Sequence, residues 1–182
     1  IVLEAKRGYL AVRVKRGCGG PTHELDFSST HHYSCVVIPD FDPATGNLPP
    51  GEHLATWDEI RTRFGHTDWR RELLAGFREA LLALRAAGCK KVYLDGSFVT
   101  AKARPGDFDA CWDTDGVDFD LLDPVLLTFD RGRATQKAKY RGELFLADAE
   151  ADPLGTLFRA FFQTDRDGNP KGIVVIDLKD LR

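Results

Sequence analysis

The sequence predicts an α/β or α+β domain, in which a small mixed β-sheet is flanked by helices. Short runs rich in Val, Ile and Leu alternate with longer amphipathic stretches, as strands and helices do in this class. Clusters of Gly, Pro, Asp and Asn separate the two kinds of segment. With 182 residues, 43% of them hydrophobic, the chain can form one ordinary globular domain with some length to spare.

Charge and composition exclude several classes of protein. The formal net charge of −3 argues against a globally basic surface for nucleic acid, although a local basic patch is compatible with it. No apolar run reaches the length of about 18 residues that a transmembrane helix needs, and the first residues lack the apolar core of a signal peptide. The four cysteines form no Cys-x-x-Cys pair, so we expect reduced thiols, a cytoplasmic location and no membrane partner.

Residues 1–36 predict little regular structure. Tyr9–Val14 is a candidate strand. His31 and His32 suggest a metal pair, but adjacent residues in a strand point apart, which favours a surface pair. The chain also contains no methionine and begins with isoleucine. We therefore interpret residues 1–36 as a poorly defined N-terminal extension that need not belong to the native domain, which runs over residues 37–182.

A loop-rich arm and a short helix are expected at the start of this domain. Pro39–Gly51 is dense in turn-forming residues. Thr56 and Glu59 have the spacing of a capping box, in which the Thr hydroxyl and the Glu carboxylate each bind a free backbone N–H. This spacing predicts a helix from Trp57 to about Phe64.

A second and longer helix is expected to pack on the sheet. Thr67 caps it, and it ends near Ala87 with Gly88 as the next residue. Apolar residues recur along it at spacings of three and four: Trp69, Leu73, Phe77, Leu81 and Leu84. Charged residues are expected to fill much of its other side: Arg70, Arg71, Glu72, Arg78, Glu79 and Arg85. All three tryptophans are predicted to lie in the core: Trp57, Trp69 and Trp112.

Strands and helices alternate over the remaining residues. Apolar runs predict four strands: Lys91–Asp95, Phe108–Trp112, Glu143–Ala147 and Ile173–Leu178. Helices are predicted from Pro124 through Phe129, where Asp123 precedes a proline in the first helical position, and over Leu154–Gln163. A basic segment lies between these regions, and is either a solvated helix or loop or a contact for an RNA acceptor: Arg131, Arg133, Lys137, Lys139 and Arg141.

The pair Gly96-Ser97 follows directly on the first of these four strands. Because Gly96 has no side chain, backbone amides next to it can approach an anion closely. The Ser97 hydroxyl adds another donor at the same place. These two residues therefore predict a binding site for phosphate oxygens. Lys102 and Arg104, in the following loop, either help to hold the triphosphate or are ordinary solvated charges.

Two carboxylates, Asp107 and Asp109, surround Phe108 on the next strand. Since alternate residues of a strand share a face, both carboxylates are expected to point the same way, opposite to Phe108, Ala110 and Trp112. Close carboxylates repel each other in a low-dielectric site, and a divalent cation relieves this repulsion. We predict that Asp107 and Asp109 hold Mg²⁺ (or Mn²⁺), which prefers oxygen ligands and bridges to the phosphates of a nucleoside triphosphate.

This pattern resembles the DNA polymerase β-like nucleotidyltransferase superfamily, in which a hydrophobic strand, Gly-Ser, a short spacer and Asp-hydrophobic-Asp follow one another. The resemblance covers about Val92–Trp112. Several segments are more closely similar to an uncharacterised bacterial family of such proteins with the pattern DGSFVT…PGDxD: Pro39–Pro43, Asn47–Gly51, Asp95–Thr100 and Lys171–Val174. This closer similarity extends from about Val37 to the C-terminus.

The resemblance implies the nucleotidyltransferase fold and the transfer of a nucleoside monophosphate to an RNA, protein or small-molecule acceptor. It also implies a third carboxylate, which joins Asp107 and Asp109 as a base or metal ligand. Glu143 is the first choice and Asp177 the second, followed by Asp118 or Asp120. By resemblance alone, such a protein would act in a bacterial toxin–antitoxin or defence module with a cognate partner.

A function of another class stays open beside this one. The chain would then be a catalytically inactive nucleotide- or protein-binding module, similar to an antitoxin, on the same fold. The position of the third carboxylate distinguishes the two: if Glu143 and Asp177 both point away from the acidic pair, the inactive module gains support. A phosphatase or nuclease would leave Gly96-Ser97 without a task.

Overall fold

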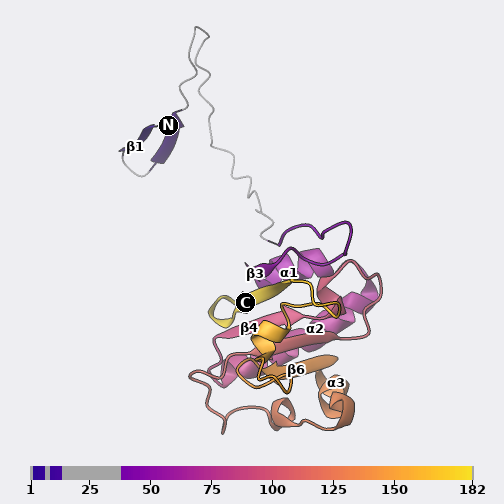
Figure 1. Ribbon diagram of the computed structural model, residues 1–182. Coiled ribbons are helices and arrows are strands. Elements are labelled where there is room, and N and C mark those ends of the chain that lie inside the picture. Colours follow the sequence, from indigo (N-terminus) through magenta and orange to yellow (C-terminus); the bar gives the residue numbers. More distant parts are fainter. Residues whose placement is uncertain (1, 7–8, 14–37, 182) are drawn as a thin grey trace. The chain divides into compact units, whose positions relative to one another are not determined.

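The computed structural model describes residues 2–6, 9–13 and 38–181 (Figure 1). The chain divides into two compact units, Ile1–Ser34 and Cys35–Arg182. The first contains one antiparallel pair of strands, and the second contains all the other elements described below.

The strand pair of the first unit consists of β1 (Val2–Lys6) and β2 (Tyr9–Arg13). Strand β2 lies within Tyr9–Val14, so the predicted strand is confirmed there. Other predictions for this region concern residues outside the described ranges: Cys18, His31, His32 and Cys35.

A five-stranded mixed sheet forms the centre of the second unit. Its strands, in spatial order, are β3 (Gly51–Leu54), β7 (Gly172–Asp177), β4 (Lys91–Asp95), β5 (Phe108–Trp112) and β6 (Gly142–Leu146). The β3–β7 and β5–β6 pairs are parallel, whereas β7–β4 and β4–β5 are antiparallel. The predicted class, a small mixed sheet with flanking helices, is confirmed.

Helices α1 (Trp57–Phe64) and α2 (Asp68–Ala86) start at the predicted caps. The Thr56 hydroxyl accepts a hydrogen bond from the Glu59 amide, and the Glu59 carboxylate accepts one from the Thr56 amide. These mutual bonds satisfy two backbone donors that the helix leaves free. In the described ranges, no helix is long and apolar enough to cross a membrane.

The two faces of the sheet bury different side chains. The larger core joins α1 and α2 to residues that alternate along the strands, among them Val92, Leu94, Phe108, Ala110 and Trp112. A smaller cluster covers the other face and contains Tyr93, Cys111, Phe145, Ile173 and Val175. The alternation follows from the two-residue period of a strand, and confirms the predicted orientation of Phe108, Ala110 and Trp112.

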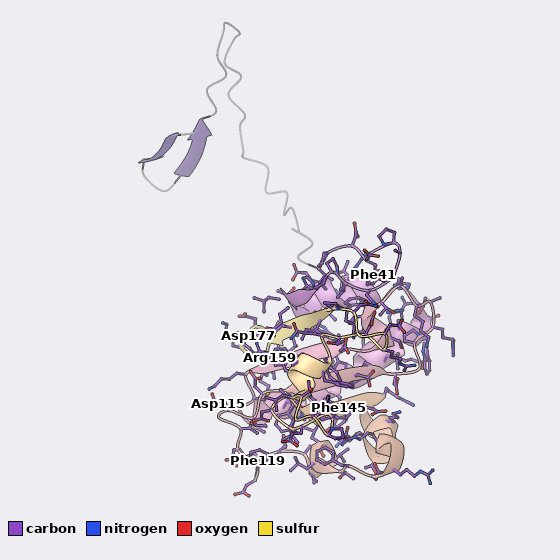
Figure 2. All side chains as sticks on the ribbon, in the orientation of Figure 1. Phe41, Asp115, Phe119, Phe145, Arg159 and Asp177 are labelled. Carbon is purple, nitrogen blue, oxygen red and sulfur yellow. The ribbon has the colours of Figure 1, made fainter. Side chains whose placement is uncertain are left out.

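Helix α4 (Phe158–Phe161) packs on the second face. Arg159 of this helix makes two hydrogen bonds to the Glu52 carboxylate on β3, at 2.7 and 2.9 Å, and its guanidinium lies 4.6 Å from the centre of the Tyr93 ring. Phe158 stacks on Phe145 of β6 with ring centres 4.2 Å apart. Figure 2 labels Phe145 and Arg159 on this side of the sheet.

Two predicted helices differ in the structure, and one strand was not predicted. The helix predicted over Leu154–Gln163 is wrong, because only Phe158–Phe161 is α-helical. The Asp152 carboxylate accepts hydrogen bonds from the amides of Leu154 and Thr156, and such local bonds hold the chain in turns instead of a helix. The helix predicted from Pro124 through Phe129 is a 3₁₀ helix, η2 (Pro124–Leu127). The predicted loop-rich arm, Pro39–Gly51, is confirmed up to its last residue, where strand β3, which we did not predict, begins.

The basic segment forms a helix, α3 (Ala134–Tyr140), which packs closely on α2 at Gly76. A Cβ at Gly76 would lie 2.1 Å from the Tyr140 carbonyl oxygen. Close packing of α3 therefore requires glycine in the interior of α2, although glycine costs about 1 kcal/mol relative to alanine there.

We expect Gly76→Ala to lower the free energy of unfolding by about 2 kcal/mol, because the backbone clash outweighs the gain in helix propensity. Urea denaturation measures this loss. Ala75→Gly, on the exposed side of the same helix, isolates the propensity effect and should cost about 1 kcal/mol. A Gly76→Ala variant more stable than wild type would show that the two helices can move apart freely.

Candidate functional site

Strand ends bring the candidate residues together at one end of the sheet. Asp95 is the last residue of β4, and it lies opposite Asp109 in the antiparallel β4–β5 pair. Asp109 in turn lies opposite Glu143 in the parallel β5–β6 pair. Three neighbouring strands therefore each place one carboxylate in the same row across the sheet.

These carboxylates share the second face of the sheet. Asp109 follows Phe108 and precedes Ala110, which both lie in the larger core on the opposite face. Asp107 departs from the prediction, because β5 begins only at Phe108. Asp107 therefore lies just before the strand. The direction of its side chain is not set by the alternation of residues along β5.

Gly96 lies directly against the Asp109 carboxylate. Its backbone has a φ of 78°, which is in the left-handed region that favours glycine. A Cβ at this position would lie 2.1 Å from Oδ2 of Asp109. Any other residue would push the carboxylate away. The loop that starts at Gly96 and the acidic residue of the next strand thus form one continuous site.

Ser97 begins a 3₁₀ turn, η1 (Ser97–Val99), whose side chains Phe98 and Val99 are buried in the larger core. The Ser97 carbonyl accepts a hydrogen bond of 2.9 Å from the Thr100 hydroxyl. Buried hydrophobic side chains and this bond hold the loop after Gly96 in place. Ser97 itself is only partly buried.

Lys137 on α3 joins two of the carboxylates. Its Nζ lies 2.9 Å from Oδ2 of Asp107 and 2.5 Å from Oε1 of Glu143. These two ion pairs raise the pKa of Lys137, with the Glu143 contact as the larger cause. The sequence indicated a basic segment here, but only the packing of α3 beside β6 identifies Lys137 as the residue that reaches the acidic cluster.

Lys171 forms a second ion pair at the site, with Asp95. Asp95 is 4% exposed, and burial raises the pKa of its carboxyl while the Lys171 ammonium lowers it. Lys171 immediately precedes β7, which places it beside the end of β4. A lysine just outside a turn gives no sequence signal for such a contact, and we did not predict it.

The site contains more negative than positive charge. Four carboxylates, those of Asp95, Asp107, Asp109 and Glu143, face three cations: Lys137 and Lys171, which form ion pairs with all of them except Asp109, and Arg133, whose charge interacts with Glu143. Burial raises the pKa of Asp109 to about 7, and the charges of Asp107, Glu143 and Asp95 act in the same direction. The cluster therefore favours either a bound proton or a further cation.

This pKa predicts a pH dependence of stability. The pKa of Asp109 in the folded protein, about 7, exceeds its ordinary value of 3.8. The folded state then binds the proton more tightly than the unfolded chain. The resulting stability is fully present below the pKa of the unfolded state, and it is lost as the pH rises through 7.

We compare the free energy of unfolding of Asp109→Asn with that of wild type, both in EDTA. We expect the difference to change in favour of the variant by roughly 2–4 kcal/mol as the pH rises from 4 to 8. Urea denaturation at several pH values measures this difference. Asp167→Asn, in an exposed turn, is the matched control and should show no such trend. A difference that is constant with pH would contradict the raised pKa.

Arg70 of α2 anchors the loop that follows Gly96. Arg70 is 1% exposed, and its guanidinium donates hydrogen bonds to the carbonyls of Phe98, Thr100 and Lys102 at 2.8, 3.3 and 2.7 Å. A further bond of 3.5 Å reaches the Phe64 carbonyl. Burial lowers the pKa of Arg70. The prediction that Arg70 lies on the charged outer side of α2 is wrong, because the loop carbonyls replace water around its charge.

The helical spacing contains a signal for Arg70 that we did not use. Arg70 stands three residues before Leu73 and seven before Phe77, so it falls on the same stripe as these buried residues. A charged residue on an apolar stripe indicates a buried polar partner. In contrast, the side chain of Lys102 is exposed, and its backbone carbonyl is the group that contacts Arg70.

The alternative third carboxylates lie elsewhere. Asp177 stands opposite Lys91, at the other end of β4 from Asp95, and binds the amide and ammonium of Lys179. Asp118 lies near the same end, where its amide donates to the Ala87 carbonyl, and its carboxylate accepts from the Asp120 amide. Figure 2 labels Asp177. Of the candidates, only Glu143 is beside Asp107 and Asp109.

A ready-made metal site is not present in the described part of the chain, where no three His, Cys, Asp or Glu side chains are arranged to hold an ion. Asp107 and Glu143 instead bind the Lys137 ammonium. The donor set nevertheless consists of carboxylate oxygens, which Mg²⁺ prefers. Coordination would require Lys137 to leave these oxygens.

The fold and the site together define the class of this protein: a mixed α+β domain with an acidic cluster, next to a glycine loop, at one end of its sheet. A sequence profile described as "Family of unknown function (DUF6932)" matches residues 39–177. Because the match covers more than half of the chain, the chain belongs to this family. Comparisons with curated proteins and with solved structures found no match.

Proposed function

We propose that the chain is a Mg²⁺-dependent nucleotidyltransferase with the nucleotidyltransferase fold. It would move a nucleoside monophosphate from a nucleoside triphosphate to a hydroxyl group of an RNA, a protein or a small molecule. The observation that supports this most is the close approach of Gly96 to the Asp109 carboxylate. A loop suited to phosphates and a carboxylate suited to a metal ion then belong to one site.

The excess of negative charge supports a divalent cation as a partner of the acidic cluster. Asp107 and Asp109 would hold Mg²⁺, which would neutralise charge on the phosphates and lower the pKa of an attacking hydroxyl. The raised pKa of Asp109 fits a carboxylate that needs a cation to be ionised at neutral pH. Lys137, once displaced, would be free to bind a phosphate oxygen.

The residues of the chain have distinct tasks in this reaction. Backbone amides at Gly96-Ser97 and the Ser97 hydroxyl would bind phosphate oxygens. The acceptor hydroxyl oxygen attacks the α-phosphorus, and the bond from this phosphorus to the oxygen of the β-phosphate breaks, so that pyrophosphate leaves. Glu143, beside the acidic pair, would accept the proton of the hydroxyl group.

An inactive binding module is a second candidate, and the position of Lys137 supports it. An ammonium group that binds Asp107 and Glu143 can replace a metal ion permanently and neutralise the cluster. Such a protein would bind a nucleotide or a protein without transferring a group. The two functions differ in whether Mg²⁺ displaces Lys137.

The decisive experiment incubates the full chain with each α-³²P-labelled nucleoside triphosphate, Mg²⁺ and either total RNA or cell lysate. Transfer of label to a macromolecule or to a small acceptor supports the enzyme. If the folded protein transfers no label from any triphosphate with either acceptor pool, the proposed transfer reaction is wrong.

Thermal unfolding tests binding separately from transfer. A ligand that binds only the folded state raises the melting temperature. We expect a triphosphate with Mg²⁺, at about 100 times its Kd, to stabilise wild type by about 2.7 kcal/mol. Stabilisation without label transfer would favour the inactive module, whereas an unchanged melting temperature at millimolar ligand would count against the transferase and against a nucleotide-binding module.

A further inference from the structure

Arg133, at the start of α3, is held in an unusual way beside the acidic cluster. Its guanidinium lies 4.3 Å from the ring centres of both Phe129 and Phe145. Among the described residues, its Nη1 is buried and has no hydrogen-bond partner. The guanidinium group thus contacts two aromatic rings, while its Nη1 donor has no acceptor.

The backbone at Arg133 is strained to achieve this position. Its φ is 53° and its ψ is 35°, in the left-handed region that a residue with a side chain rarely adopts. The preceding residue, Gly132, also has a positive φ of 65°. Strain and unsatisfied donors persist mainly where function requires them.

The anchoring of α3 keeps this arrangement rigid. The buried side chain of Gln136 donates a hydrogen bond to the Leu126 carbonyl and accepts one of 2.8 Å from the Leu144 amide. This second bond ties α3 to β6, the strand that carries both Glu143 and Phe145. Arg133 contacts Phe145 and Lys137 contacts Glu143; these two β6 residues are two apart and therefore share a face of the sheet.

The acidic cluster lies between these two cations and the glycine loop. Gly96 follows β4, Asp109 is on β5 and Glu143 is on β6, which are neighbours in this order. Lys137 contacts Glu143 directly, and the charge of Glu143 acts on Arg133. A phosphate chain above Asp109 would therefore extend from the glycine loop on one side toward α3 on the other.

We propose that Arg133, together with Lys137, forms a second phosphate-binding subsite, which holds the phosphate chain of the nucleoside triphosphate on the side opposite Gly96-Ser97. The proposal rests on the proposed function for the identity of the ligand. A guanidinium group presents paired N–H donors that match phosphate oxygens. Stacking on Phe129 and Phe145 sets the direction of these donors before the ligand arrives.

Calorimetric titration with sodium tripolyphosphate and with ATP, each in the presence of Mg²⁺, tests the subsite. Arg133→Met keeps a long apolar side chain beside the two rings but removes all donors. We expect it to weaken both ligands at least about tenfold. Arg133→Lys keeps the charge without the fork and should give an intermediate loss. Arg131→Met, at an exposed neighbouring arginine, should bind as wild type does.

A melting curve separates binding from a merely structural role. If Arg133 serves only to stack on the rings, Arg133→Met lowers the melting temperature and leaves affinity within twofold of wild type, which would overturn the subsite. If the subsite is real, affinity falls while the melting temperature stays constant or rises, because a buried donor without a partner has been removed.

The two proposals can fail separately. Loss of tripolyphosphate affinity in Arg133→Met, in a protein that transfers no label, supports the subsite and contradicts the transfer reaction. Label transfer by a protein whose Arg133→Met variant binds both ligands like wild type supports the reaction and overturns the subsite. Wild-type protein that binds neither ligand also overturns the subsite.

Discussion

Asp109→Asn should reduce nucleotide transfer by at least about a thousandfold, equivalent to about 4 kcal/mol of transition-state stabilisation. The substitution preserves the size of the side chain and its packing on Gly96, but removes the charge that would hold the metal ion. Asp107→Asn should have an effect of the same order, because it would remove the second proposed metal ligand and removes one partner of Lys137.

The measurement is the initial rate of label transfer at saturating triphosphate and Mg²⁺. Asp167→Asn, at an exposed carboxylate in a turn, should retain the wild-type rate. The Asn variants should remain folded, and Asp109→Asn should be more stable than wild type above pH 7 because the charged form is disfavoured by burial. A variant that is folded and still transfers at the wild-type rate would exclude Asp109 from the reaction.

Arg70→Met should destabilise the domain by about 3 kcal/mol, which lowers the melting temperature of a domain of this size by roughly 6–12 °C. The methionine side chain can fill most of the space but cannot donate hydrogen bonds. The carbonyls of Phe98, Thr100 and Lys102 then lose their partner, and each buried carbonyl without a donor costs free energy.

Chemical denaturation of Arg70→Met and Arg71→Met tests this expectation directly. Arg71 is the neighbouring residue, but it lies on the exposed side of α2, where it pairs with Asp68. Its loss should cost no more than about 1 kcal/mol, as for other surface ion pairs. Equal effects of the two substitutions would show that the buried contacts of Arg70 are not what holds the loop.

The loop after Gly96 should also respond to Arg70→Met. Hydrogen exchange of the amides from Ser97 to Lys102 should accelerate more than exchange in α1, because the lost contacts are concentrated in that loop. Triphosphate affinity should fall in parallel if the loop binds phosphates. Faster exchange spread evenly over the whole domain would indicate a general loss of stability instead.

Local patterns in the sequence predicted the elements that depend on neighbouring residues. The capping box at Thr56 and the cap at Thr67 place the starts of α1 and α2 correctly, because a cap is formed by residues within one turn. The orientation of Phe108, Ala110 and Trp112 followed from the strand period. The helix over Leu154–Gln163 was predicted too long, because Asp152 binds amides in the turn before α4, and apolar periodicity alone does not reveal this competition.

In the candidate site, too, local sequence patterns predicted some residues and only the tertiary structure revealed the others. The sequence by itself identified Gly96, Asp107 and Asp109 as candidate site residues, because they belong to a short motif. It also gave a preference for Glu143 as the third carboxylate, because this residue lies at the start of a predicted strand. Only the tertiary structure decided that Glu143 lies beside the pair while Asp177 lies at the other end of β4. Strand order is a property of long-range pairing, which local propensity does not contain.

The cations around the acidic residues were decided by tertiary structure alone. Lys137 and Lys171 come from two separate parts of the chain, and each is ordinary in its local sequence. Their charges find partners only when α3 and the residue before β7 come to lie beside the end of the sheet. The sequence therefore determined where negative charge is concentrated. The fold decided which cations balance it, because electrostatic partners are chosen by distance in space and not by distance along the chain.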